Sequence, residues 1–160
     1  MTDYTFSHRA RLIKPALSYD GAALALSFLP AAGEKLPSNS RTVADDNFTY
    51  HHLRRDLFSI VKATGVSVDS RYVVPSSHIT LARFLAQSDH DSPEKMERFL
   101  EEVERINRWL VEQFWPQEGV EWTGDGEWIV GEEKGLDCRE GKLWYGGGQT
   151  VRLGKGFEKL

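Results

Sequence analysis

The segment 74–84, VPSSHITLARF, holds the residues of this chain that are best suited to chemistry. Polar and apolar residues alternate through its tetrapeptide HITL, a pattern typical of a strand with two unlike faces. Because side chains two residues apart on a strand share a face, we expect His78 and Thr80 to point the same way. Ile79 and Leu81 then point to the opposite face, where we expect a hydrophobic core.

The polar face of this strand fits phosphoester chemistry. An imidazole titrates near neutral pH and can act as a general acid or base, which assigns proton transfer to His78. The Thr80 hydroxyl can donate a hydrogen bond to an anionic oxygen held beside that imidazole. Ser76 precedes the pair on the same face as a candidate substrate-binding residue, and the small Ala82 leaves room after it. The other interpretation is an ordinary amphipathic strand with one side in water, because H-x-T is a short and common pattern.

The size and composition of the chain predict one globular domain over residues 1–160. Hydrophobic residues make up 40% and charged residues 28% of the chain, as in ordinary globular proteins. The net charge of -4 offers no basic excess for binding long nucleic acid, whereas a small phosphate ligand is compatible with it. The sequence contains no H-E-x-x-H, C-x-x-C or Walker motif, so we expect neither a metal site nor another cofactor.

The cysteine count and the first residues indicate the compartment. Cys138 is the only cysteine, so no disulfide can form within the chain, which fits a reducing environment. The N-terminal sequence MTDYTFSHRA has no apolar stretch of the kind found in secretory signals. No run approaches the roughly 20 apolar residues that cross a membrane. We therefore expect a cytoplasmic or nuclear protein with no membrane partner.

Hydrophobic periodicity predicts an α+β fold with an antiparallel sheet and two main helices. Asp20-Gly21 is a strong hairpin signal between the first two strands, and Ser92-Pro93 is a strong start for the second helix. Strands are expected at 4–14, 22–29, 66–85, 127–133, 135–146 and 149–154, and helices at 47–64 and 93–115, with a loop at 30–46. The first strand begins almost at the first residue, which suggests a chain that is incomplete at its N-terminus.

Longer segments around HITL resemble a known family. HITL fits the H-x-[ST]-h signature, with h apolar, of the 2H phosphoesterase superfamily. The segments YHHLRRDLF at 50–58, RYVVPSSHITLARF at 71–84 and EEKGLDCREGKLWYGGG at 132–148 look like fungal RNA ligase/cyclic nucleotide phosphodiesterase-like proteins. The resemblance extends over nearly the whole chain, and the long context carries more weight than the tetrapeptide.

The resemblance implies a fold, a reaction and two site residues. Proteins of this family are bilobal α+β proteins in which each lobe places one H-x-T/S motif on a strand that lines a central cleft. They act without a metal on cyclic phosphates such as 2′,3′-cyclic nucleotides or RNA ends. One histidine would activate water, the other would protonate the leaving ribose oxygen, and the hydroxyl residues would hold the phosphate. His78 and Thr80 match the second motif of the family.

The first motif of the family has no counterpart in this chain. It would lie ahead of the strand that opens the sequence, and no second H-x-T or H-x-S with an apolar neighbour is present. His90-Asp91-Ser92 has a serine at the right offset, but Asp91 replaces the apolar residue and Ser92 is better suited to cap a helix. We therefore expect a single domain resembling part of the bilobal 2H phosphoesterase fold, with its first half-site missing.

Three functions follow from this pattern. The first is a phosphoric diester hydrolase whose activity requires a missing N-terminal segment or a second chain that completes the cleft. The second is a noncatalytic nucleotide- or RNA-end-binding remnant of the family, and the third is a structural domain in which HITL has no role. An incomplete bilobal fold would expose a sheet edge or face, which favours self-association.

The remaining candidates have simpler interpretations. His51 and His52 are expected to begin a helix with one ring packed and the other in water, because neighbouring side chains on a helix point in different directions. Trp144 and Tyr145 are more typical of a small core than of a base-stacking site, and the glycines at 146–148 of a turn. Four basic residues are conceivable phosphate partners, but solvated charge is the simpler expectation for each: Arg11, Lys14, Arg71 and Arg83.

Overall fold

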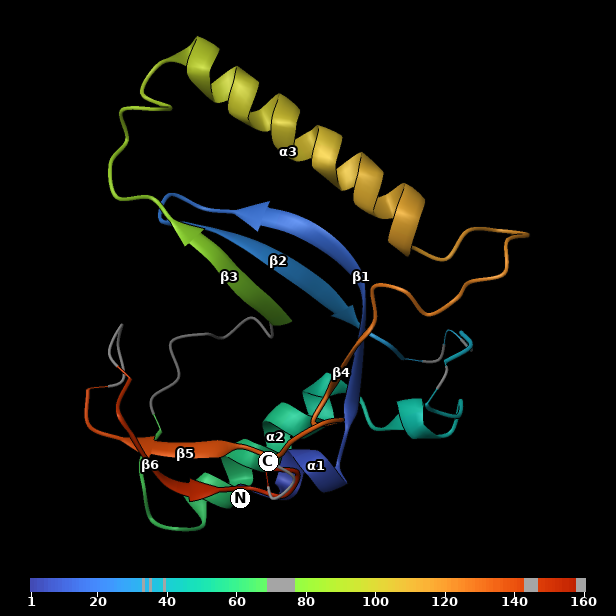
Figure 1. The fold of residues 1–160 in the computed structure, drawn as a ribbon, viewed down its shortest axis with the longest axis vertical. Coiled ribbons are helices and arrows are strands. Elements are labelled where there is room, and N and C mark those ends of the chain that lie inside the picture. The colour runs from blue at the N-terminus through green and yellow to red at the C-terminus, as the bar shows by residue number, and fades with distance from the viewer. Residues whose placement is uncertain (33, 35, 39, 69–76, 143–146, 158–160) are drawn as a thin grey trace.

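The computed structural model describes residues 1–32, 34, 36–38, 40–68, 77–142 and 147–157 (Figure 1). Its elements are α1 (Tyr4–Ser7), β1 (Ala10–Tyr19), β2 (Ala23–Pro30), the short 3₁₀ helix η1 (Asp45–Asn47), α2 (Tyr50–Lys62), β3 (Ser77–Arg83), α3 (Pro93–Phe114), β4 (Trp128–Val130), β5 (Asp137–Glu140) and β6 (Gln149–Leu153). Four strands form an antiparallel sheet in the order β3-β2-β1-β4, and β5 pairs with β6 in a separate two-stranded sheet. The predicted α+β class is confirmed.

The long strand β1 connects two parts of the molecule. Its pairing with β2 shifts between Ile13 and Ala16, and Lys14 takes a positive φ of 57°, so the strand bends there. The half before the bend also pairs with β4 and lies near α1 and α2, whereas the half after it lies beside α3 (Figure 1). The bend therefore divides the hydrophobic core into two regions.

The first core region surrounds the start of β1. Ala10, Leu12 and Ile13 are fully buried there, and Leu53 of α2 and Ile129 of β4 are buried with them. The helix α2 is amphipathic and turns its apolar side toward this region, where Leu53 is its one buried residue.

Residues 4–7 are helical, although the sequence predicted a strand over 4–14. The N-terminal segment is fixed by the loops around the β5–β6 hairpin, because the Leu136 amide donates to the Thr2 carbonyl at 2.7 Å and the Lys155 amide to the Asp3 carboxylate at 2.7 Å. A Cβ atom on Gly154 would collide with the Thr2 carbonyl, so this close approach requires glycine. Long-range contacts thus override the local strand pattern.

The helix α3 lies along the outer edge of β1. The Asn107 side chain accepts a hydrogen bond from the Leu17 amide at 2.7 Å and donates to the Leu17 carbonyl at 3.1 Å. The Trp115 indole donates to the Pro15 carbonyl at 2.9 Å. These side chains occupy backbone groups that a further strand would otherwise use, so this edge of the sheet is closed.

The N-terminus of α3 carries the cap that the sequence predicted. Ser92 accepts a hydrogen bond from the Lys95 amide, and Pro93 occupies the first helical position. Ser92→Ala is expected to lower the free energy of unfolding by about 1 kcal/mol, because the first turn loses this acceptor. Chemical denaturation measures the change, and the neighbouring exposed Ser88→Ala serves as control. Equal effects of both variants would contradict the capping role.

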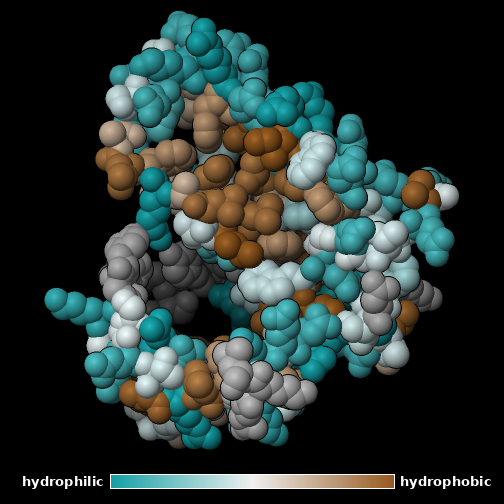
Figure 2. Space-filling model, viewed as in Figure 1, coloured by the Kyte–Doolittle hydropathy of each residue, from teal (hydrophilic) through white to brown (hydrophobic). Residues whose placement is uncertain are grey.

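Hydrophobic surface gathers below α3, over the sheet (Figure 2). An open groove of about 390 Å³ lies there, lined by Leu26, Phe28 and Ile79 from the sheet, Leu110 and Phe114 from α3, and Trp128 from β4. Because α3 packs along β1, it leaves the apolar side of β2 and β3 partly open.

Among the helices of the described residues, none combines the length and the apolar composition that a membrane span requires.

Candidate active site

The predicted strand around HITL exists as β3, which forms one end of the four-stranded sheet. Its start is fixed by the buried Ser77, whose hydroxyl donates to the Phe28 carbonyl of β2 at 2.7 Å. His78 lies opposite Ser27, and Thr80 lies opposite Ala25. Directly opposed residues of an antiparallel pair share a face, so His78 and Thr80 lie on one face, as predicted.

Two serines extend this polar face toward β1. Ser18 lies opposite Ala25, and its hydroxyl is 2.6 Å from the Ser27 hydroxyl. The face therefore carries three hydroxyls in addition to the His78 imidazole, on three neighbouring strands. The sequence contains the signal for Ser27, because small or polar residues alternate with leucines and Phe28 along β2.

A bulge in β3 changes the face of the residues that follow Thr80. Thr80 pairs with Ala25, but the next pair joins Ala82 to Leu24 and leaves Leu81 without a partner on β2. Ala82 therefore lies on the apolar side, opposite Leu24, and the prediction that it follows Thr80 on the polar face is wrong. A strict period of two cannot reveal such a bulge.

The same bulge brings Arg83 to the polar face. Arg83 pairs with Ala23, which lies on the same side of β2 as Ala25 and Ser27. Strict alternation along 77–83 would instead place it on the face of Ile79, because both have odd numbers. A cation thus lies on the face of the imidazole, opposite a β2 residue two positions from the partner of Thr80, or roughly 7 Å along the sheet.

Arg83 also lies near the β1–β2 turn. The amides of Ala22 and Ala23 donate to the Asp20 carboxylate at 2.7 and 2.8 Å. These two hydrogen bonds hold the pKa of Asp20 below its usual value, and the charge of Arg83 lowers it further. The Asp20-Gly21 turn predicted from the sequence is confirmed in this geometry.

The other side of β3 differs from the prediction. Ile79 is 43% exposed and Leu81 is 53% exposed, whereas the alternation predicted that both enter a core. The reason is the position of β3 at the end of the sheet, away from α3. His78 and Thr80 are exposed as well, and neither side chain bonds to another side chain or carbonyl among the described residues.

Two of the other histidines, His52 and His90, take part in capping or packing. His52 accepts a hydrogen bond from the Thr49 amide at 3.1 Å at the start of α2, and His51 is exposed, as expected. The His90 ring packs on Phe84 with centroids 4.8 Å apart, while Ser92 caps α3, so His90-Asp91-Ser92 is no second motif.

His8 lies in a different setting. Its ring stacks on Tyr4 with centroids 4.0 Å apart and borders an open groove of about 510 Å³ that also includes Ser7, Arg9 and Arg41. No three side chains of His, Cys, Asp or Glu are grouped as metal ligands in the described residues.

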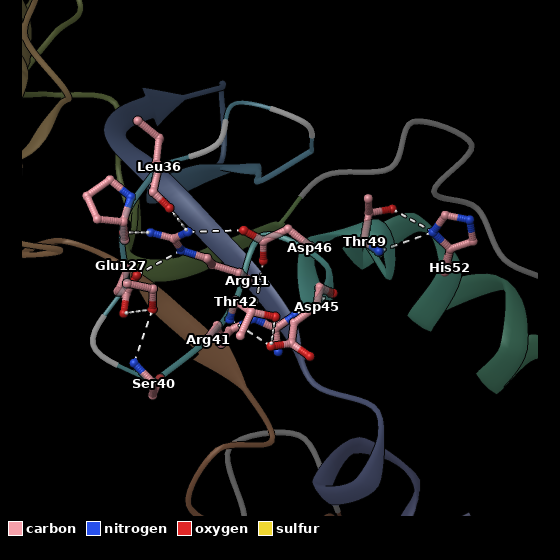
Figure 3. A network of polar contacts seen from close by, with 12 residues as sticks. Arg11, Leu36, Ser40, Arg41, Thr42, Asp45, Asp46, Thr49, His52 and Glu127 are labelled. Atoms are coloured by element: carbon pink, nitrogen blue, oxygen red, sulfur yellow. Dashed lines mark hydrogen bonds and ion pairs between the residues drawn. The ribbon is translucent and has the colours of Figure 1, made fainter.

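Arg11 is buried, although the sequence predicted a solvated charge. Only 1% of its surface is exposed, and it donates to the Glu127 carboxylate at 2.8 Å and to the Asp46 carboxylate at 3.0 Å (Figure 3). It also donates to the Leu36 and Pro37 carbonyls at 3.0 and 2.6 Å. Because these groups engage all three guanidinium nitrogens in a buried position, Arg11 joins the loop before η1 to the sheet and is not available to a phosphate.

Several predicted residues lie outside the described parts of the chain. They include the candidate binding residue Ser76, the conceivable phosphate partner Arg71, and the aromatic residues Trp144 and Tyr145. Lys14, another of the conceivable phosphate partners, lies within the described residues and forms an ion pair with Glu34 at the bend of β1.

Comparisons with family models, curated proteins and solved structures gave no match to this chain in any of the three.

Proposed function

We propose that the polar face of β1, β2 and β3 binds the phosphate of a 2′,3′-cyclic nucleotide or of an RNA 2′,3′-cyclic end and takes part in its hydrolysis. The observation that carries this proposal is the placement of the exposed His78 imidazole and the Thr80 hydroxyl on one face. The resemblance of HITL to the second motif of the 2H phosphoesterases supports the same chemistry.

The reaction needs one proton accepted and one proton supplied. Water attacks phosphorus, a new P–O bond forms, and the bond from phosphorus to a ribose oxygen breaks. A general base takes the proton from the water, and a general acid gives a proton to the leaving oxygen. His78 performs one of these two transfers. Among the described residues of this face, His78 carries the one imidazole, the side chain that most often serves as a general acid or base.

The hydroxyls and the cation on this face can stabilise the negative charge of the phosphate oxygens. Thr80 donates a hydrogen bond to a nonbridging phosphate oxygen, which gains negative charge as the water attacks. Arg83 lies on the same face, and its long side chain can reach back toward the phosphate. Arginine binds phosphate well because its donors form a planar fork. The face thus offers a proton carrier, a hydroxyl donor and a cation.

The test is turnover of 2′,3′-cyclic AMP, followed by chromatography of the monophosphate products. The chain is expected to produce adenosine monophosphate, and Thr80→Val is expected to lower kcat by about 10²-fold because one oxyanion donor is lost. Thr150→Val is the matched control, since Thr150 is an exposed strand threonine of the other sheet.

Three results separate the candidate functions. Turnover that depends on Thr80 supports hydrolysis. Saturable binding of the cyclic nucleotide without turnover supports the noncatalytic binding protein instead. The absence of both contradicts any nucleotide function of this face and leaves the structural domain.

A further inference from the structure

We propose that two copies of this chain pair through the outer edges of β3, antiparallel, with Ile79 on the two-fold axis. In this arrangement His78 of each copy lies opposite Thr80 of the other. The catalytic consequence rests on the proposed function, whereas the pairing itself rests on the sheet edge.

The two ends of the sheet are treated differently. The edge of β1 is closed by β4 over its first half and by the side chains of Asn107 and Trp115 over its second half. The outer edge of β3 makes no backbone hydrogen bond with any described residue. A free edge presents a row of amides and carbonyls that can pair with another strand.

The first part of β3 lacks the features that usually block edge pairing. Residues 77–80, SHIT, contain no proline, lysine or acidic residue, and the bulge begins only after Thr80. Ile79 is 43% exposed at this edge, so pairing would remove apolar surface from water. The edge is therefore suited to a partner strand over these residues.

Three physical conditions select one register. In an antiparallel pair, opposed residues lie on the same face of the sheet. The two-fold axis therefore has to lie between the two copies of one residue, so that polar residues of one copy oppose polar residues of the other. An axis at His78 would oppose two imidazoles, which repel each other when protonated. An axis at Thr80 would place the bulge of each copy in the pairing. An axis at Ile79 opposes isoleucine to isoleucine, places no imidazole directly opposite the other, and stays clear of the bulge when the pairing covers residues 78–80.

A second copy fits this edge better than an unrelated strand. With the axis at Ile79, an imidazole faces a hydroxyl on the polar side and two isoleucines meet on the apolar side, with no like charges opposed. The pairing is also self-complementary, as two-fold symmetry requires. Such an edge contact is smaller than the roughly 1,200 Å² of a typical stable interface, so the dimer forms in a concentration-dependent way.

This dimer supplies the proton-transfer group that one copy lacks. The two His78 residues become diagonal neighbours on adjacent strands, with Cβ atoms roughly 7–8 Å apart. Each imidazole lies beside the partner's Thr80, whose Cβ is about 5 Å away. One His78 then takes the proton of the attacking water, and the second protonates the leaving ribose oxygen, so the site is incomplete in a monomer.

Cysteine cross-linking tests the register. In a Cys138→Ser background, which removes the native thiol, Ile79→Cys is expected to give a disulfide-linked dimer on mild oxidation, because opposed Cα atoms are about 4.5–5.5 Å apart. Leu81→Cys is the matched control, since the two copies of residue 81 would be separated by four residues along the strands. Equal or stronger cross-linking of Leu81→Cys, or none of Ile79→Cys, overturns the proposal.

Sedimentation velocity separates this proposal from the proposed function. The protein is expected to shift from monomer to dimer as its concentration rises, and Ile79→Lys is expected to abolish this shift. Val151→Lys, which changes a strand residue that is 53% exposed in the other sheet, is expected to have no effect. A monomer that still hydrolyses the cyclic nucleotide overturns the dimer and leaves the function standing. A β3 dimer without turnover supports the pairing and overturns the hydrolysis.

Discussion

Replacing Arg11 by Met is expected to lower the free energy of unfolding by about 3–5 kcal/mol, because removing one partner of a buried ion pair leaves uncompensated charge. Arg11 contacts two carboxylates and two backbone carbonyls. After the substitution, Asp46 keeps the ion pair with Arg41, and Glu127 keeps the hydrogen bond from Ser38.

The size of this effect can be checked by urea denaturation. Arg105→Met is the control, because Arg105 is 65% exposed and its solvent-screened ion pair with Glu102 is expected to contribute little to stability. Arg11→Lys keeps the charge but loses the planar fork, so its loss of stability should lie between the two. A change below about 1 kcal/mol for Arg11→Met would show that the network is not needed for folding.

His78→Ala is expected to lower the rate of hydrolysis of 2′,3′-cyclic AMP by about 10²–10⁴-fold, because the face loses its proton-transfer group. The free energy of unfolding should change by less than about 0.5 kcal/mol, since an exposed residue without side-chain partners in the described structure supports little packing. The measurements are initial rates of product formation and denaturant midpoints for the same preparation.

His51→Ala is the matched control for His78→Ala. His51 is also exposed, but it lies on α2, away from the polar face of the sheet. Its substitution should leave the rate unchanged. Full activity of His78→Ala would contradict the assigned proton transfer, and an equal loss in both variants would indicate a general effect on the protein.

The sequence predicted the elements whose signals are local. Ser92-Pro93 marked the start of α3, Asp20-Gly21 marked the β1–β2 turn, and the alternation of HITL marked β3. Each of these features depends on residues close together in the chain, so capping, turn and period-two rules find them. The same rules placed His78 and Thr80 on one face.

The remaining features depend on contacts between distant segments. Arg11 resembles any charged residue of a strand, and its burial follows from carboxylates 35 and 116 residues away. The segment 4–7 has a strand-like pattern but takes its shape from the loops beside β5 and β6. Neither result can be read from a local period.

The bulge explains why part of the candidate site was missed. It follows Thr80 and moves Arg83 to the polar face and Ala82 away from it. No glycine or proline in HITLAR marks this irregularity. Ile79 and Leu81 were predicted to be buried because alternation identifies an apolar face, but it does not show whether another element covers that face.

The most direct test of the central claim is a titration of the five histidine side chains, observed by NMR, with adenosine 2′-monophosphate as a product of the proposed reaction. If the polar face binds phosphate, the ring signals of His78 shift saturably, while those of His51, His52 and His90 stay in place. A saturable shift of His8, beside the groove of Arg9 and Arg41, with no change at His78, would contradict the account.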